Sequence, residues 1–182
     1  MTSATLGSET RLTEEQYFAL PPTSERVELF DGKRVVTPAP NNTHQYIATK
    51  LTTAFDLAAE PRGLIVMATI NLRLWQDTVP IPDLVIVTHA PSDETSDADA
   101  AVLVCEIVSP SKPSRDKVKK MRAYARARIP WYLVAEQTGD LHLYRLEGKH
   151  YVQHSVALQG ETLHLTEPVE VSIDTTKLRL PK

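Results

Sequence analysis

The first third of the chain alternates between a helical pattern and strand-like patterns. Thr13 and Gln16 have the spacing of a capping box, so a short helix is predicted to begin there and to end before Pro21. Two short apolar runs, residues 27–30 and 33–36, flank an Asp-Gly pair. This arrangement predicts a hairpin with a type I′ turn.

A longer helix is predicted over residues 43–60, with Asn42 or Thr43 as its cap. Its apolar residues recur at the 3.6-residue period of a helix that buries one face. The Pro-Arg-Gly sequence at 61–63 is expected to end it. The residues of the apolar stripe are Ile47, Ala48, Leu51, Phe55 and Ala58.

Strands dominate the rest of the chain. Residues 101–108 form the most apolar run, so this strand is expected to be central. The polar, acidic stretch 89–100 is expected to be a mobile loop. A basic helix is predicted over 114–128, with Ser114 as its cap. The other predicted strands lie at 64–75 (one or two strands), 83–87, 131–136, 141–146, and in short segments from Tyr151 onward.

This order predicts an α/β fold, with a mixed central β-sheet flanked by helices and extra β-strands at the C-terminal end. A right-handed crossover through the basic helix would make strands 101–108 and 131–136 parallel. Residues 1–11 are expected to form a flexible tail, and residues 12–182 a single domain.

Composition narrows the class of protein. Hydrophobic residues make up 42% of the chain and charged residues 24%, as in ordinary globular proteins. No apolar run approaches the ~18 to 20 residues of a membrane span, and the N-terminus lacks the pattern of a signal peptide. The expected compartment is therefore the cytoplasm. Cys105 is the only cysteine, so an internal disulfide is excluded and no Cys/His cluster is spaced for zinc.

The formal net charge of -3 argues against a protein that coats DNA through its overall charge. The charge is uneven, however. Lys and Arg crowd residues 112–128, whereas residues 93–99 hold acids and no base. This basic stretch is therefore either a surface that touches a phosphate backbone or, more commonly for such a run, a solvated helix face.

Glu106 is the sharpest anomaly, because it interrupts the apolar strand 101–108. Strand alternation would put it on one face with Val102, Val104 and Val108. A carboxylate in such a place costs several kcal/mol unless a metal, a lysine or a helix N-terminus pairs with it. A structural ion pair or an exposed strand end would also explain it.

Asp83 begins the other apolar strand, directly after Pro82. Together with Glu106 it would form an oxygen-rich site that suits Mg²⁺ or Mn²⁺. Lys120 lies on the basic helix, and helical spacing groups it with small and aromatic residues rather than with Lys119. It is either an active-site cation or a lysine whose stem covers apolar surface.

These residues stand in short motifs whose order and spacing resemble a known family. The motifs are Pro-Asp at 82–83, Glu-Ile-Val-Ser-Pro-Ser at 106–111, Asp116 to Tyr124, Glu-Leu-Phe-Asp-Gly at 28–32, His44, and Ile-Pro-Trp-Tyr-Leu-Val at 129–134. Together they resemble the Uma (Uma-two) family of the PD-(D/E)XK nuclease superfamily. The resemblance extends over roughly residues 14 to 150, and it implies a restriction-endonuclease-like fold.

The resemblance also implies roles for the site residues. Asp83 and Glu106 would hold a divalent ion, Mg²⁺ or Mn²⁺, with help from the backbone carbonyl of Ile107. The superfamily's simplest pattern puts a lysine two positions after the acid, where this chain has Val108. In the Uma branch Lys120 takes that place from the following helix. The implied roles therefore require Lys120 to reach the carboxylates.

Four further residues are candidates to line the site. His44 lies on the apolar face of the first long helix, where a histidine is more often a core residue than a site residue. Glu28 would extend the acidic cluster or pair with a base. Asp116 and Tyr124 are expected to anchor the basic helix rather than to do chemistry.

The predicted function is hydrolysis of nucleic-acid phosphodiesters by a metal-dependent endonuclease, with DNA as the expected partner, no membrane partner, and a homodimer as one option. Lys120 would help to generate hydroxide or would stabilise the transition state. One rival is a non-catalytic binding or regulatory protein on the same scaffold. Another is a metal-dependent hydrolase of a different substrate.

Overall fold

The computed structural model describes residues 11–91, 95–108 and 114–181, with the side chains of 114–117 left undescribed. Most of the predicted tail, residues 1–10, and the side chain of Asp116 therefore lie outside the described part. The elements before the sheet are α1 (Glu14–Phe18), β1 (Arg26–Phe30), β2 (Lys33–Thr37), α2 (Asn42–Ala59) and the 3-10 turn η1 (Glu60–Arg62).

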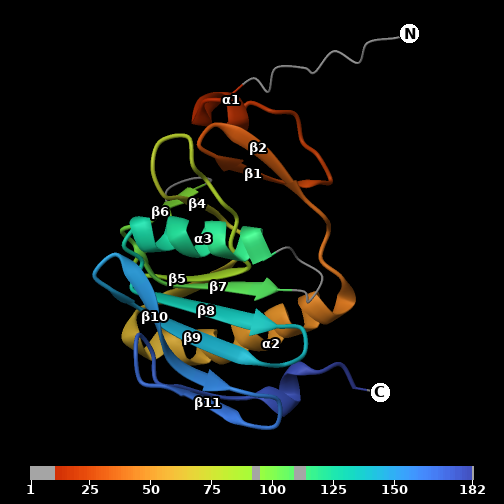
Figure 1. The fold of residues 1–182 in the computed structure, drawn as a ribbon, viewed down its shortest axis with the longest axis vertical. Coiled ribbons are helices and arrows are strands. Elements are labelled where there is room, and N and C mark those ends of the chain that lie inside the picture. Colours follow the sequence, from red (N-terminus) through yellow and green to blue (C-terminus); the bar gives the residue numbers. More distant parts are fainter. Residues whose placement is uncertain (1–10, 92–94, 109–113, 182) are drawn as a thin grey trace.

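A six-stranded sheet forms the centre of the fold, in the order β10-β9-β8-β7-β5-β3 (Figure 1). Within this sheet, β7 and β8 are the one parallel pair. The helix α3 (Ser114–Arg126) connects them, as predicted. The other neighbours are antiparallel, so the sheet is mixed. Its strands are β3 (Ile65–Ala68), β5 (Leu84–Val87), β7 (Ala101–Val108), β8 (Trp131–Glu136), β9 (Leu141–Glu147) and β10 (His150–Ala157).

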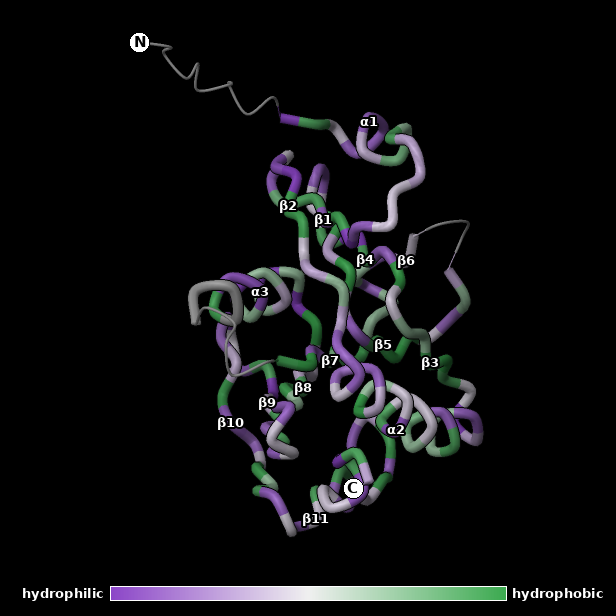
Figure 2. Tube along the Cα trace, turned by 90° about the vertical axis from the view of Figure 1, so that its right-hand side faces the viewer, coloured by the Kyte–Doolittle hydropathy of each residue, from purple (hydrophilic) through white to green (hydrophobic). Residues whose placement is uncertain are grey.

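Helices α2 and α3 cover opposite faces of this sheet (Figure 2). The face toward α2 buries the predicted stripe of Ile47, Leu51 and Phe55. The face toward α3 buries Tyr124 against alternate residues of the strands, such as Val104. Because β7 has a covered face on each side, its near-continuous apolar sequence is explained.

The strand alternation predicted for β7 is wrong at one residue. Val104 and Val108 share the α3 face, whereas Val102 packs with the α2 side. The pairing of β5 with β7 shifts register between Ile86 and Val87, so β7 carries a bulge near Val102. An extra residue in a strand reverses the facing of the residues beyond it. The alternation holds from Leu103 to Val108, which includes Glu106.

The acidic stretch 89–100 is not entirely a loop. Residues Thr95–Asp97 form β6, which pairs in parallel with β4 (Asn71–Arg73). Arg73 Nη1 lies 2.7 Å from Asp97 Oδ1, and the side chains of Thr95 and Ser96 are buried. The predicted loop is therefore wrong at these residues. The predicted segment 64–75 forms two strands, β3 and β4, in separate sheets.

The C-terminal strands are present as expected. Strands β11 (Thr162–Leu165) and β12 (Val171–Asp174) form an antiparallel pair, followed by the 3-10 turn η2 (Thr175–Leu178). Leu163 and Ile173 of this pair extend the core on the α2 side. Among the described helices, none is long and apolar enough to cross a membrane.

The hairpin β1–β2 lies beyond one end of the sheet, above α3 in Figure 1. Asp31 and Gly32 both have positive φ, 49° and 76°, as a type I′ turn requires. Leu29 pairs with Val79, which ties the hairpin to the segment that leads into β5. The capping box of α1 is also formed, while Asn41, one residue earlier than predicted, caps α2.

We predict that Gly32→Ala costs about 2–3 kcal/mol of unfolding free energy. A Cβ at Gly32 would need a left-handed backbone and would lie 3.2 Å from the carbonyl oxygen of Leu12. Gly63 has a similar φ of +67° but open space around it, so Gly63→Ala should cost only about 1 kcal/mol. Denaturant unfolding of both variants measures the difference. Equal costs would show that the fit of the hairpin against residues 11–12 contributes nothing.

Candidate active site

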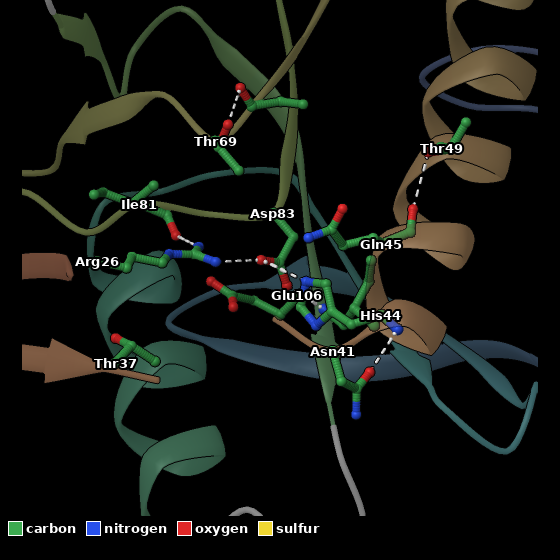
Figure 3. A network of polar contacts seen from close by, with 12 residues as sticks. Arg26, Thr37, Asn41, His44, Gln45, Thr49, Thr69, Ile81, Asp83 and Glu106 are labelled. Carbon is green, nitrogen blue, oxygen red and sulfur yellow. Dashed lines mark hydrogen bonds and ion pairs between the residues drawn. The ribbon is translucent and has the colours of Figure 1, made fainter. Parts of the chain in front are cut away.

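Asp83, Glu106 and His44 meet where β5 begins and β7 ends (Figure 3). Leu84 pairs with Cys105, so Asp83 and Glu106 occupy adjacent strand positions. Both side chains are buried, with 2% and 3% of their surface exposed. Lys120 and Glu28 are equally buried, at 5% and 2%. The site is therefore an ionic cluster inside the fold, not a set of surface charges.

Lys120 reaches into this cluster from α3. Its Nζ donates to Glu28 Oε1 at 2.9 Å and to both carboxylate oxygens of Glu106, at 3.0 and 3.1 Å. The helical face predicted from spacing is confirmed, because Lys120 and Tyr124 are buried while Lys119 is exposed. The requirement that the ammonium reach a carboxylate of the site is met.

Asp83 is held by three donors from three different segments. Its Oδ1 accepts a hydrogen bond from Arg26 Nη1 at 2.7 Å and lies 3.2 Å from His44 Nε2. Its Oδ2 accepts from the backbone N–H of Ile107 at 2.7 Å. These contacts fix both the position and the rotation of the carboxylate.

Glu28 and Tyr124 complete the cluster. Glu28 Oε1 also accepts from the backbone N–H of Ile81 at 2.7 Å, which joins the hairpin to the segment before Asp83. The hydroxyl of Tyr124 donates to Glu106 Oε1 at 2.6 Å. Glu28 thus extends the acidic cluster as well as pairing with a base. Tyr124 anchors α3, as predicted, and also touches Glu106.

His44 lies in the first turn of α2, where its backbone N–H donates to Oδ1 of the N-cap residue Asn41 at 2.9 Å. The sequence favoured a core role for this histidine. In the structure its Nε2 instead faces Asp83. Figure 3 shows His44 approaching Asp83 from the α2 side, opposite Arg26. The lining role is the one that the geometry favours.

Arg26 is the member of the cluster that sequence analysis missed. Its guanidinium pairs with Asp83 and donates to the carbonyl of Ile81. Its Nε is buried without a hydrogen-bond partner. The available signal was period-two alternation along β1, which puts Arg26 and Glu28 on one face. Two opposite charges on one face of a short strand are too common to identify a site by themselves.

The charges of the cluster shift one another's protonation. Burial alone would raise the pKa of Asp83, but the hydrogen bond from His44 and the positive charge of Arg26 outweigh it and hold this pKa well below its usual range. Burial raises the pKa of Glu106, against the attraction of Lys120 and with the repulsion of Asp83 and Glu28. Burial would lower the pKa of Lys120, but Glu106 and Glu28 together raise it.

The balance of charge is negative. Its three carboxylates, Asp83, Glu106 and Glu28, outnumber its two cations, Arg26 and Lys120. Repulsion by Asp83 and Glu28 adds to the effect of burial in raising the pKa of Glu106, in agreement with this excess of carboxylates. Such a cluster attracts a further cation. Among the described residues, however, no group of three or more His, Cys, Asp or Glu side chains is already arranged as a metal site.

The chain matches the model of a known protein family. The model of the Uma2 family, described as "Putative restriction endonuclease", matches residues 14–177. The chain belongs to the Uma2 family. The match covers every residue of the buried cluster, so the family predicted from short motifs is confirmed.

A solved structure supports the fold of this Uma2 protein. A crystal structure of a "putative nuclease" from Anabaena variabilis matches with a TM-score of 0.72, over 92% of this chain and 97% of the other. The sequence identity is 14%, so the likeness establishes the restriction-endonuclease-like fold and not the residue roles. No curated protein gave a significant match.

We predict that Glu106→Gln stabilises the metal-free protein by about 1 kcal/mol at neutral pH, because it removes the cost of burying an ionised carboxylate, which Lys120 only partly offsets. In the folded state the pKa of Glu106 is raised above its ordinary 4.5. Ionised Glu106 therefore lowers the free energy of unfolding of wild type. This loss of stability is absent below about pH 4.5, grows as pH rises through the raised pKa, and is constant above it.

Denaturant unfolding in EDTA across this pH range measures the difference between variant and wild type. Glu147→Gln, which removes an exposed carboxylate from β9, reports the effect of losing one charge at the surface. A Glu106→Gln variant that is less stable than wild type at pH 7 would contradict the charge balance described for the site.

Proposed function

We propose that this Uma2 protein is a metal-dependent endonuclease that hydrolyses DNA phosphodiesters at the cluster of Asp83, Glu106 and Lys120. The observation that carries the proposal is the placement of Lys120, whose ammonium lies within 3.1 Å of both oxygens of the buried Glu106. A buried cation between carboxylates of separate elements is costly to build, so it favours a functional site.

The donors fit a hard divalent ion. Asp83 and Glu106 offer carboxylate oxygens from neighbouring strands, and the cluster has negative charge to spare. Mg²⁺ is commonly held by one or two carboxylates, with waters and substrate phosphates as its other ligands, so a third acidic ligand is not needed. Asp83 and Glu106 would hold Mg²⁺ or Mn²⁺, and the carbonyl of Ile107 is a third candidate ligand.

When bound, the ion would lower the pKa of a water and offset charge on the phosphate. The protein's own groups have separate tasks. Because the raised pKa of Lys120 keeps it protonated, it would act as a fixed positive charge near the developing charge of the transition state rather than as a base. Tyr124 orients Glu106 through its hydroxyl.

Arg26 and His44 would be positioning residues. Both contact Oδ1 of Asp83, from opposite sides, and keep that carboxylate ionised at low pH. Glu28 would be a positioning residue for Lys120, since its Oε1 contacts both Lys120 Nζ and the backbone N–H of Ile81.

One observation favours the rival, a non-catalytic protein on this scaffold. Every oxygen of Asp83 and Glu106 already accepts a hydrogen bond from a protein donor. In a purely structural cluster these pairs would be the final state. In a metal site, at least one of these hydrogen bonds, such as that of Arg26 with Asp83, breaks so that the carboxylate oxygen can bind the ion.

The proposal is tested by cleavage of single- and double-stranded DNA with Mg²⁺ or Mn²⁺. We expect wild type to cut only with metal, and Lys120→Met and Glu106→Gln to lose about 100-fold or more of the rate. Lys119→Met is the matched control. Lys119 directly precedes Lys120, but its Nζ lies 4.2 Å from the centre of the Phe30 ring, outside the cluster. It should cut like wild type.

A second readout separates loss of chemistry from loss of fold. Metal should raise the unfolding midpoint of wild type, because a ligand of the folded state stabilises it, and should not raise that of Glu106→Gln. Wild type that neither cuts any substrate nor gains stability from metal would support the non-catalytic rival. Equal loss of cutting in the Lys119 and Lys120 variants would contradict the assigned roles.

A further inference from the structure

A hollow of about 650 Å³ lies on the outer side of α3, between that helix and the start of β10. It is separate from the ionic cluster, because Lys120 and Tyr124 point into the fold from the opposite side of the same helix. The described residues that line it are Val118, Met121, Arg122, Ala125, Arg126, Arg128, Lys149, His150 and Tyr151.

The rim of this hollow carries one sign of charge. Four of the described lining residues are Arg or Lys, one is His, and none is Asp or Glu. This contrasts with the formal net charge of -3 for the whole chain. Arg122 and Lys149 are exposed, and their side chains make no ion pair or hydrogen bond with the residues that the structure describes. Unpaired cations gathered around a concave surface favour an anionic ligand.

The floor of the hollow is apolar. Val118, Met121 and Ala125 lie along α3, and Tyr151 faces them from β10. The hydroxyl of Tyr151 donates to the carbonyl of Ile129 at 2.8 Å, which fixes the ring. An apolar floor with a fixed aromatic ring suits a flat, weakly polar group such as a nucleobase better than a bare anion.

Two of the rim arginines are held in place. The guanidinium of Arg126 lies 4.2 Å from the centre of the Trp75 ring, and Arg128 donates to the carbonyl of Gly148. Arg122 and Lys149 are left to meet a ligand. The hollow therefore has two arginines held in fixed positions and two exposed cations whose side chains can turn toward a ligand. Such an arrangement is found where a nucleic-acid strand is held by its phosphates.

We propose that this hollow binds an unpaired nucleotide of a single DNA strand, with the base on the apolar floor and the flanking phosphates on Arg122 and Lys149. The inference rests on the proposed function, since the strand would continue from a substrate bound at Asp83, Glu106 and Lys120. A helix is about 10 Å across, a span that a few nucleotides of an extended strand cover.

The first test is fluorescence anisotropy of a 5′-labelled oligothymidylate in EDTA, where no cleavage occurs. The double variant Arg122→Gln/Lys149→Gln should bind about tenfold or more weakly than wild type, and its slope of log affinity against log salt should fall by about 1 to 2. The control Lys177→Gln/Arg179→Gln removes the same charge from the exposed C-terminal end and should bind like wild type.

A second arm asks whether a base occupies the hollow. An abasic oligonucleotide of equal length should bind wild type at least about fivefold more weakly than oligothymidylate, because it cannot stack. Val118 is 42% exposed and lines the hollow, so Val118→Trp fills the space without removing charge or core. This variant should bind both oligonucleotides about equally.

The inference is overturned if the double variant binds oligothymidylate no more weakly than the control, or if wild type does not discriminate against the abasic strand. These outcomes are distinguishable from failure of the proposed function. The nuclease proposal is judged by metal-dependent cutting, whereas this site is judged by binding in EDTA, where no cutting takes place. Metal-dependent cutting by wild type, together with unchanged binding in the double variant, would leave the nuclease proposal standing and this site refuted.

Discussion

The ammonium of Lys120, buried between Glu106 and Glu28, is the interaction on which this structure depends. Removing a charge from water costs several kcal/mol unless partners are held in place. Here the partners come from β1 and β7, and the lysine comes from α3. The contact therefore fixes the hairpin and the helix against the end of the sheet. Local sequence preference alone would fix neither of these contacts.

Within the cluster, one carboxylate is stabilised by its partners and the other lowers the stability of the fold. Asp83 is stabilised in its ionised form by Arg26 and His44, whereas burial, together with repulsion from Asp83 and Glu28, raises the pKa of Glu106. A protein selected for stability alone would neutralise Glu106. An excess of negative charge is useful only if a further cation arrives, and this is the physical link between the buried cluster and the proposed metal chemistry.

Much of the cluster could be predicted from the sequence, because two of its residues are charged at positions where the local pattern predicts an apolar side chain. Glu106 stands in an apolar strand, and Lys120 shares a helix face with buried residues, so each is visible without the fold. Arg26 breaks no rule, and contacts between segments distant in the sequence, such as the pairing of Leu29 with Val79, bring β1 to the site. The bulge near Val102 and the strand at Thr95–Asp97 were also missed, because both arise from partners distant in the sequence.

The proposed chemistry requires Asp83 and Glu106 to share a divalent ion. The most direct measurement is anomalous diffraction from crystals of the protein soaked with Mn²⁺. We expect a peak at about 2.0–2.3 Å from an oxygen of each carboxylate, with Lys120 still beside Glu106. A cluster that keeps the Arg26–Asp83 pair intact and shows no peak between the two carboxylates at saturating Mn²⁺ would contradict it.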